Sequence, residues 1–174
     1  MIRTMIAALV LTTSVQASET KKINPYWSLS QYDTMCVADT VYQGGIMMFV
    51  RCHSEWQGAD IRLCNKRWKI TPGKEYEGKI IFNDGNYDIP MVGSEGDTVG
   101  GKCLETKSWF GFDSGVYTRL MIKPWWNMSI NGKMMSGKKL MLRGSKEALA
   151  VLAGCHQSIA GGTFDRSPDS GDTF

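Results

Sequence analysis

The chain has 174 residues, of which 43% are hydrophobic and 21% charged, a composition that fits one folded domain and excludes a disordered or collagen-like chain. Its formal net charge is only +3 and its basic residues are scattered, so we expect no nucleic-acid partner. Nineteen glycines against five prolines indicate many turns, which is typical of a chain built mainly of β-strands.

Residues 1–17 have the pattern of a secretory signal peptide. One positive charge, at Arg3, precedes an uncharged run from Met5 to Val15, and Val15-Gln16-Ala17 is a small-x-small cleavage site. The run has about 11 residues, whereas a membrane-spanning helix needs roughly 20, so we expect no membrane span. We predict cleavage after Ala17 and a mature protein that is periplasmic or secreted.

The mature chain is expected to contain short strands joined by tight turns. Residues 18–24 are polar and are interpreted as a loose leader. Apolar and β-branched runs predict strands, in chain order, at residues 26–31, 34–42, 46–53, 59–65, 67–70, 76–82, 87–92, 125–130 and 134–142. Asn83-Asp84-Gly85-Asn86 and Asn131-Gly132 are hairpin turns, and residues 93–101 are interpreted as a flexible loop.

Two short helices complete the predicted fold. Residues 115–122 can begin at an N-cap in Asp113-Ser114, and a firmer C-terminal helix over 146–153 is expected to begin after Ser145 and to end at Gly154. Residues 158–174 are polar and are interpreted as a disordered tail. The prediction is one mainly β domain over residues 18–157, an antiparallel β-sandwich or a barrel-like meander.

An exported chain with an odd number of cysteines should form disulfides and leave one thiol over. The chain has five, at Cys36, Cys52, Cys64, Cys103 and Cys155. Cys52 and Cys64 are placed symmetrically about Gly58, between the strands predicted at 46–53 and 59–65. If Gly58 lies at the turn, the two would face each other across a hairpin at a distance that a disulfide can bridge. The alternative is that both thiols are buried and reduced.

No catalytic or metal-binding motif is recognised in the chain. The two histidines, His53 and His156, each follow a cysteine directly, but the spacing does not match a zinc site, and we expect no metal or cofactor. A G-x-S-x-G nucleophile motif is absent. Acidic residues in or near turns leave a hydrolase open as an alternative, namely Asp84, Asp88, Glu95 and Asp97.

The aromatic residues of the C-terminal half are a candidate contact surface. Trp125 and Trp126 are adjacent, so on one strand one would face inward and the other outward. Trp109, Phe110 and Phe112 lie shortly upstream. An exposed cluster of such rings could anchor a protein or glycan partner, while the alternative is ordinary core packing.

The C-terminal third resembles a known family. Residues 128–130, 139–145 and 148–152 resemble the end of the invasion-associated locus B family, small exported bacterial β proteins that close with a strand, a glycine and a helix. The resemblance implies a non-enzymatic envelope or secreted protein linked to host interaction. It also implies a disulfide between Cys36, in Cys36-Val37-Ala38, and Cys155, with Cys103 as the odd thiol if Cys52 pairs with Cys64.

The sequence therefore predicts an exported protein that acts by binding a protein or glycan partner of the envelope or host. A first alternative is a periplasmic inhibitor or immunity protein against a cell-wall hydrolase, with residues 93–101 or 83–86 as the loop that plugs a cleft. A second alternative is a secreted hydrolase.

Overall fold

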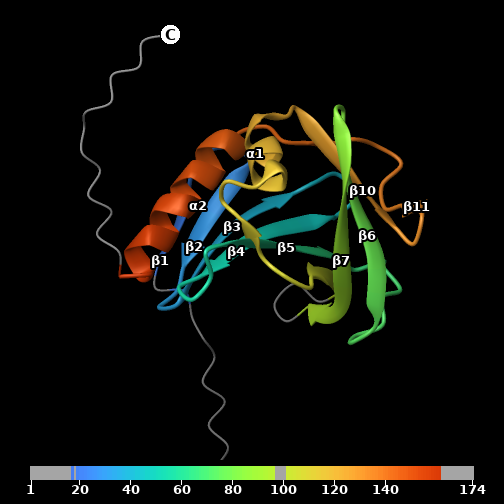
Figure 1. The fold of residues 1–174 in the computed structure, drawn as a ribbon, viewed down its shortest axis with the longest axis horizontal. Coiled ribbons are helices and arrows are strands. Elements are labelled where there is room, and N and C mark those ends of the chain that lie inside the picture. The colour runs from blue at the N-terminus through green and yellow to red at the C-terminus, as the bar shows by residue number, and fades with distance from the viewer. Residues whose placement is uncertain (1–16, 18, 97–100, 162–174) are drawn as a thin grey trace, which may run out of the picture.

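The computed structural model describes residues 17, 19–96 and 101–161, and these residues form twelve strands and two helices (Figure 1). Nearly all of the predicted signal peptide, and the part of the predicted tail after residue 161, lie outside the described residues. The elements are β1 (Glu19–Lys22), β2 (Trp27–Gln31), β3 (Met35–Val41), β4 (Met47–His53), β5 (Gly58–Asn65), β6 (Glu75–Phe82), β7 (Gly85–Gly96), β8 (Gly101–Thr106), β9 (Phe110–Gly111), α1 (Gly115–Ile122), β10 (Trp125–Ile130), β11 (Lys133–Met134), β12 (Leu140–Met141) and α2 (Ser145–Ile159).

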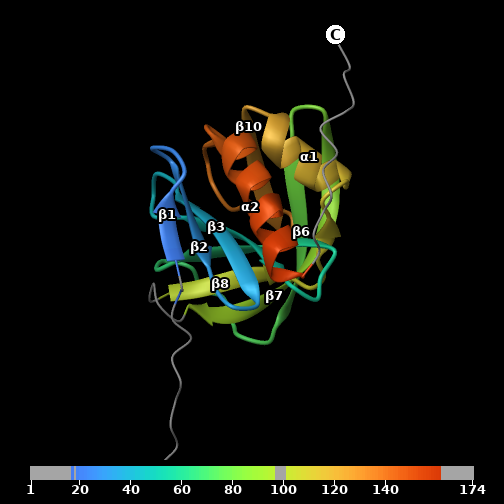
Figure 2. The ribbon, with the colours of Figure 1, turned by 90° about the vertical axis from the view of Figure 1, so that its left-hand side faces the viewer.

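The strands belong to one antiparallel sheet in the order β1-β2-β3-β4-β5-β8-β7-β6-β10-β11, with β12 also on β10 and β9 on β5. This confirms the prediction of a mainly β fold with a C-terminal helix. The sheet bends strongly, so β6 and β7 run across the direction of β3 to β5, and α2 lies over β2, β3 and β4 (Figures 1 and 2).

The core lies between the curved sheet and α2. On β4 the side chains of Met48, Val50 and Cys52 are fully buried and alternate with half-buried neighbours, as expected for a strand with one face on a core. Ala148, Leu149 and Leu152 supply the buried face of α2. Both predicted hairpin turns are present, since Asn83 and Asp84 join β6 to β7, and Asn131 and Gly132 adopt positive φ between β10 and β11. Ser114 caps α1 by accepting a hydrogen bond from the backbone N–H of Tyr117.

The C-terminal helix is longer than predicted. Its N-cap is Gly144 at φ +72°, not Ser145, whose hydroxyl instead donates to the Leu142 carbonyl at 2.9 Å. Gly154 does not end the helix, which continues to Ile159, so the predicted disordered tail cannot begin at residue 158. Cys155 and His156 are buried in this last part, and their packing offsets the helix stability that a glycine costs, about 1 kcal/mol.

Other boundaries also differ from the predictions. The expected leader contains β1, which pairs with β2 but is exposed at all four residues and so carries no hydrophobic pattern. Within the expected loop at 93–101, the residues that the structure describes are strand, because β7 runs to Gly96 and β8 begins at Gly101. A Cβ at Gly93 would lie 2.2 Å from the Thr71 carbonyl oxygen, so this glycine permits a close backbone approach. Residues 67–70 are not a strand, and of residues 134–142 only Met134 and Leu140–Met141 are strand.

The two disulfides are Cys36–Cys155 and Cys64–Cys103. The first confirms the pairing that the family resemblance implied. The second shows that the expected Cys52–Cys64 pair is wrong, and that Cys103 is not the odd thiol, because the free cysteine is the buried Cys52.

The register of β4 on β5 explains this error. Arg51 lies opposite Asp60, so the hairpin turns before Gly58, which already belongs to β5. Cys64 then lies opposite Met47, on the other side of the sheet from Cys52. On its far edge β5 pairs with β8, where Cys64 is directly opposite Cys103 with their Cα atoms 4.1 Å apart.

Candidate binding groove

A groove of about 570 Å³ lies where the end of β3 faces β12. Three stretches of chain that are distant in sequence form it: the residue before β2, the end of β3 with the turn that follows it, and the segment that leads through β12 to α2. The lining residues are Tyr26, Thr40, Val41, Tyr42, Gln43, Ser136, Gly137, Lys138, Lys139, Leu140, Met141 and Arg143.

One side of the groove is shaped by an interruption in the last strand position of the sheet. One edge of β10 pairs with β12 at its start and with β11 at its end. Residues 135–139 arch away between these two short strands. The Asn127 side-chain amide holds the arch by donating to the carbonyls of Ser136 at 3.2 Å and Lys138 at 3.3 Å. The arch therefore has a defined position without being a strand.

The base of the groove is packed and hydrogen-bonded. The indole Nε1 of Trp126, which is fully buried, donates to the Tyr42 hydroxyl at 3.1 Å. Burial raises the pKa of Tyr42 above its ordinary value, so the phenol stays neutral at physiological pH. The Thr40 hydroxyl donates to the Tyr26 carbonyl at 2.8 Å, and Leu140 is buried. These contacts fix the positions of the side chains at the base.

The walls are apolar and open to solvent. The side chains of Tyr26, Val41 and Met141 are 48%, 66% and 46% exposed. Within the described residues only three other large hydrophobic side chains are exposed, at Trp109, Ile122 and Met134, so half of the exposed apolar side chains gather at this groove. Clustering of this kind marks contact surfaces.

The charges of the groove have one sign. Lys138, Lys139 and Arg143 line it, and no carboxylate does. None of the three forms an ion pair with any residue that the structure describes; the Lys139 ammonium lies over the Trp125 ring, 4.0 Å from its centroid. The groove therefore favours an anionic ligand with apolar groups.

A second groove, of about 770 Å³, lies over β6 and β7 and is less suited to a charged ligand. Its acids are Glu75, Glu77 and Asp88, and two of them already bind lysines. Glu75 pairs with Lys107 at 2.5 Å, and Asp88 pairs with Lys79 at 3.2 Å.

The five aromatic residues predicted as a contact surface do not form one cluster. Trp126 is buried and Trp125 half-buried, as the alternation of a strand requires, and Trp125 lies opposite Met141 at the groove. The other three lie elsewhere: Trp109 is 46% exposed beside Gly58, while the rings of Phe110 and Phe112 pack against Tyr117 of α1.

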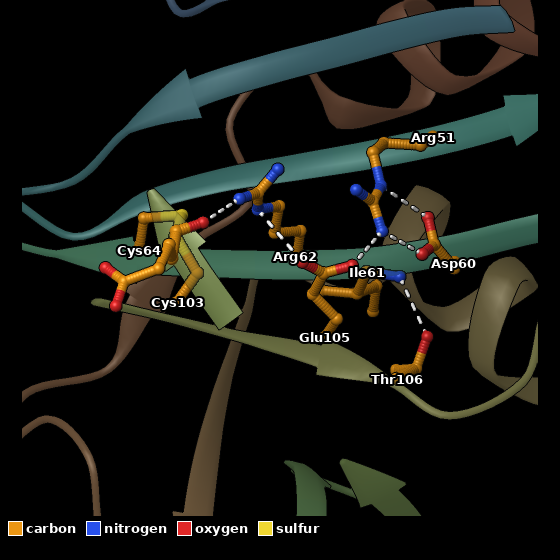
Figure 3. Close-up of polar contacts among 9 residues, drawn as sticks. Arg51, Asp60, Ile61, Arg62, Cys64, Cys103, Glu105 and Thr106 are labelled. Atoms are coloured by element: carbon orange, nitrogen blue, oxygen red, sulfur yellow. Dashed lines mark hydrogen bonds and ion pairs between the residues drawn. A yellow bond between two sulfur atoms is a disulfide. The ribbon is translucent and has the colours of Figure 1, made fainter. Parts of the chain in front are cut away.

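The buried Asp60 and the half-buried Glu105 belong to an ion-pair network on β4, β5 and β8 (Figure 3). The Arg51 guanidinium binds both carboxylate oxygens of Asp60 and also Glu105, the latter at 2.7 Å. Arg62 Nε lies 3.3 Å from the same Glu105. Two acids facing two arginines leave neither carboxylate available as a catalytic acid or base, so this network reads as structural.

The buried Cys52 thiol and the His156 imidazole are also engaged within the protein. Burial raises the pKa of the Cys52 thiol to about 12, so it is not a nucleophile at neutral pH. His156 Nε2 lies 3.0 Å from the His53 carbonyl and 2.6 Å from that of Trp56; both only accept, so this nitrogen carries the proton. No cluster of metal-ligating side chains occurs among the described residues, and none of their helices is long and apolar enough to cross a membrane.

The loops proposed as an inhibitory plug are tied down or lie partly outside the described residues. Residues 83–84 form a two-residue turn, and Asp84 binds Arg119 at 3.2 Å and Lys123 at 2.9 Å. Residues 97–100 belong to the part that is not described.

Sequence reasoning missed the groove because its parts are far apart in the chain. Lys138-Lys139 is a visible basic pair, but two residues are too few to indicate a site. Val41 and Met141 are unremarkable until the sheet brings their strands to the same place. Comparison of the chain with protein-family models, curated proteins and solved structures finds no match. The resemblance to the invasion-associated locus B family stays a prediction.

Proposed function

We propose that this protein is an exported, non-catalytic binding protein that takes an acidic partner in the groove between β3 and β12. The observation that carries the proposal is the combination of Lys138, Lys139 and Arg143 with exposed apolar walls and no carboxylate. Cations beside apolar surface attract an anionic partner over a distance and hold it by burial on contact. The arginine–carboxylate network and the protonated Cys52 thiol favour binding over hydrolysis.

Export is supported by the N-terminal pattern and by the two disulfides, which persist mainly in oxidising compartments. The intact mass of protein recovered from its native host should correspond to a chain that begins at Ser18. A mature species that retains Met1 would contradict export by this route.

The groove is tested by charge reversal in the full mature chain. The triple variant K138E/K139E/R143E should bind a labelled oligoglutamate peptide and polygalacturonate at least tenfold more weakly than the wild type, whichever of the two the wild type binds. The control K66E/R67E/K69E reverses the same kinds of charge at exposed positions outside the groove and should bind within about twofold of the wild type. An equal loss of affinity in both variants would mean that binding depends only on the net charge of the protein, and it would overturn the proposal.

A further inference from the structure

The side of β12 that faces away from β10 has backbone N–H and C=O groups that pair with no strand among the described residues. The Leu142 N–H donates to the Pro124 carbonyl at 3.0 Å. In an antiparallel pair, residues that exchange hydrogen bonds alternate with residues that do not, so Met141, opposite Trp125, directs its N–H and C=O away from β10. Within the described residues no strand pairs with that side of β12.

The opposite side of the groove is only partly paired. The Tyr42 N–H donates to the Ile46 carbonyl at 2.8 Å, so the neighbouring Val41 directs its backbone groups away from β4. On that side β2 begins only at Trp27, opposite Thr40. The register places Tyr26 opposite Val41, so the Tyr26 carbonyl, which also accepts from the Thr40 hydroxyl, faces the Val41 N–H. The Tyr26 N–H instead donates to Asn24 and so does not pair with the Val41 carbonyl.

Unpaired strand edges are templates for a further strand. Here Met141, at the free edge, and Val41, which also lines the groove, have exposed apolar side chains, and Lys138, Lys139 and Arg143 lie beside them. An extended peptide meets all three features, because its amides pair with an edge, its alternate side chains pack on the walls and its carboxylates face the cations. A polyanionic glycan would meet the charges but has no regular row of amide donors and acceptors.

We infer that the groove binds an extended acidic segment of a partner protein, which adds a strand to β12 at Met141. This inference rests on the proposed function, since it names the chemical class of the partner and the way in which it is held. The ligand is a negatively charged peptide strand, which the groove recognises through the peptide backbone as well as through its carboxylates.

The first test changes the backbone of the probe, a labelled peptide of alternating Glu and Val that is bound to the full mature chain. Two isomers methylated on alternate amides, one at the Glu positions and one at the Val positions, keep every side chain and charge. Strand pairing uses one edge of the peptide, so one isomer should lose at least tenfold in affinity while the other binds within about twofold of the parent.

The second test changes the backbone of the protein. Met141→Pro removes the N–H that faces away from β10 while leaving the hydrogen bond of Leu142 to Pro124 in place. This substitution should lower the affinity for the unmethylated peptide about tenfold without changing the melting temperature. Met141→Val, which keeps the N–H, should bind the same peptide within about twofold of the wild type. If Met141→Pro does not fold, the two methylated isomers decide the question alone.

Three results would overturn the strand inference. Equal binding of both methylated isomers with loss in K138E/K139E/R143E would leave a purely electrostatic site, and the proposed function would stand. Binding of polygalacturonate but not of the peptide would make the partner a glycan, again with the proposed function intact. Peptide binding only after removal of residues 162–174, which contain three aspartates, would make that segment of the chain the occupant.

Discussion

Cys36 and Cys52 lie directly opposite each other on β3 and β4, yet Cys36 is bonded to Cys155 on α2 and Cys52 keeps a free thiol. The single proton of the Cys52 thiol lies within reach of two acceptors, the Cys36 carbonyl at 3.6 Å and the Leu152 carbonyl at 3.9 Å. Helix α2 therefore forms a disulfide with one cysteine of the cross-strand pair, Cys36, and covers the other, Cys52.

Cys52 should resist alkylation in the folded protein. Its pKa of about 12 leaves almost no thiolate at about pH 8, so iodoacetamide should label it only on unfolding. Because the folded-state pKa is raised, the stability that the protonated thiol contributes is full below the ordinary thiol range and is lost as pH rises towards 12. Cys52→Ala should reduce this alkaline loss. Mass spectrometry of labelled protein measures the first effect, and rapid labelling of the folded wild type would contradict it.

Peptide mapping without reduction should recover Cys36 joined to Cys155 and Cys64 joined to Cys103. The closed loops span 119 and 39 residues, so the chain-entropy model gives contributions of about 5 and 4 kcal/mol to the free energy of unfolding. Cys36→Ala with Cys155→Ala should therefore destabilise slightly more than the matched Cys64→Ala with Cys103→Ala, as measured by denaturant unfolding. A Cys52–Cys64 peptide would refute the pairing.

Glu105 should make stability depend on pH in the acid range. Burial raises the pKa of this carboxyl, but the Ser94 side chain and the charges of Arg51 and Arg62 outweigh it, so the pKa lies below the ordinary value. Its contribution is therefore full above the ordinary carboxyl range and is lost as pH falls through the lowered value. Glu105→Gln should lower the free energy of unfolding by about 1.5–3 kcal/mol at neutral pH. It should also make that free energy fall less steeply as the pH drops into the acid range. The control Glu75→Gln, on an exposed pair, should stay within about 0.5 kcal/mol.

The adjacent tryptophans should respond differently to truncation. Trp126→Ala removes a fully buried ring and its hydrogen bond to Tyr42, so it should cost about 3–5 kcal/mol in denaturant unfolding. Trp125→Ala should leave the melting temperature nearly unchanged but weaken binding in the groove, because its ring supports the side chain of Lys139, which lines the groove. Equal destabilisation by both substitutions would mean that Trp125 belongs to the core and not to the groove.

The parts of the fold that depend on local chemistry could be predicted from the sequence. The hairpin turn at Asn83-Asp84, the left-handed pair Asn131-Gly132 and the N-cap at Ser114 each depend on residues a few positions apart. The parts that depend on distant pairing could not. Strand β8 has little apolar pattern and is held between β5 and β7, so its place, and with it the Cys64–Cys103 bond, follows only from the complete sheet order.

The groove could not be predicted for the same reason. The groove is open because β2 begins only at Trp27 and because residues 135–139 leave the sheet between β11 and β12. The first is a strand boundary, which sequence patterns locate poorly. The second depends on hydrogen bonds from Asn127 to backbone carbonyls nine and eleven residues away. A charge count alone indicated neither.

The contacts of Asn24 and Trp27 with the start of α2 also constrain how the chain can fold. The Trp27 indole donates to the Arg143 carbonyl at 2.9 Å, and the Asn24 amide donates to that of Gly144 at 3.0 Å, across 116 and 120 residues of sequence. Contacts between such distant positions raise the contact order, which slows folding. In a chain that emerges from its N-terminus, the faces of β2, β3 and β4 that α2 covers stay bare until almost the whole protein has been made. Until then, this incomplete domain is the form most exposed to aggregation and proteolysis.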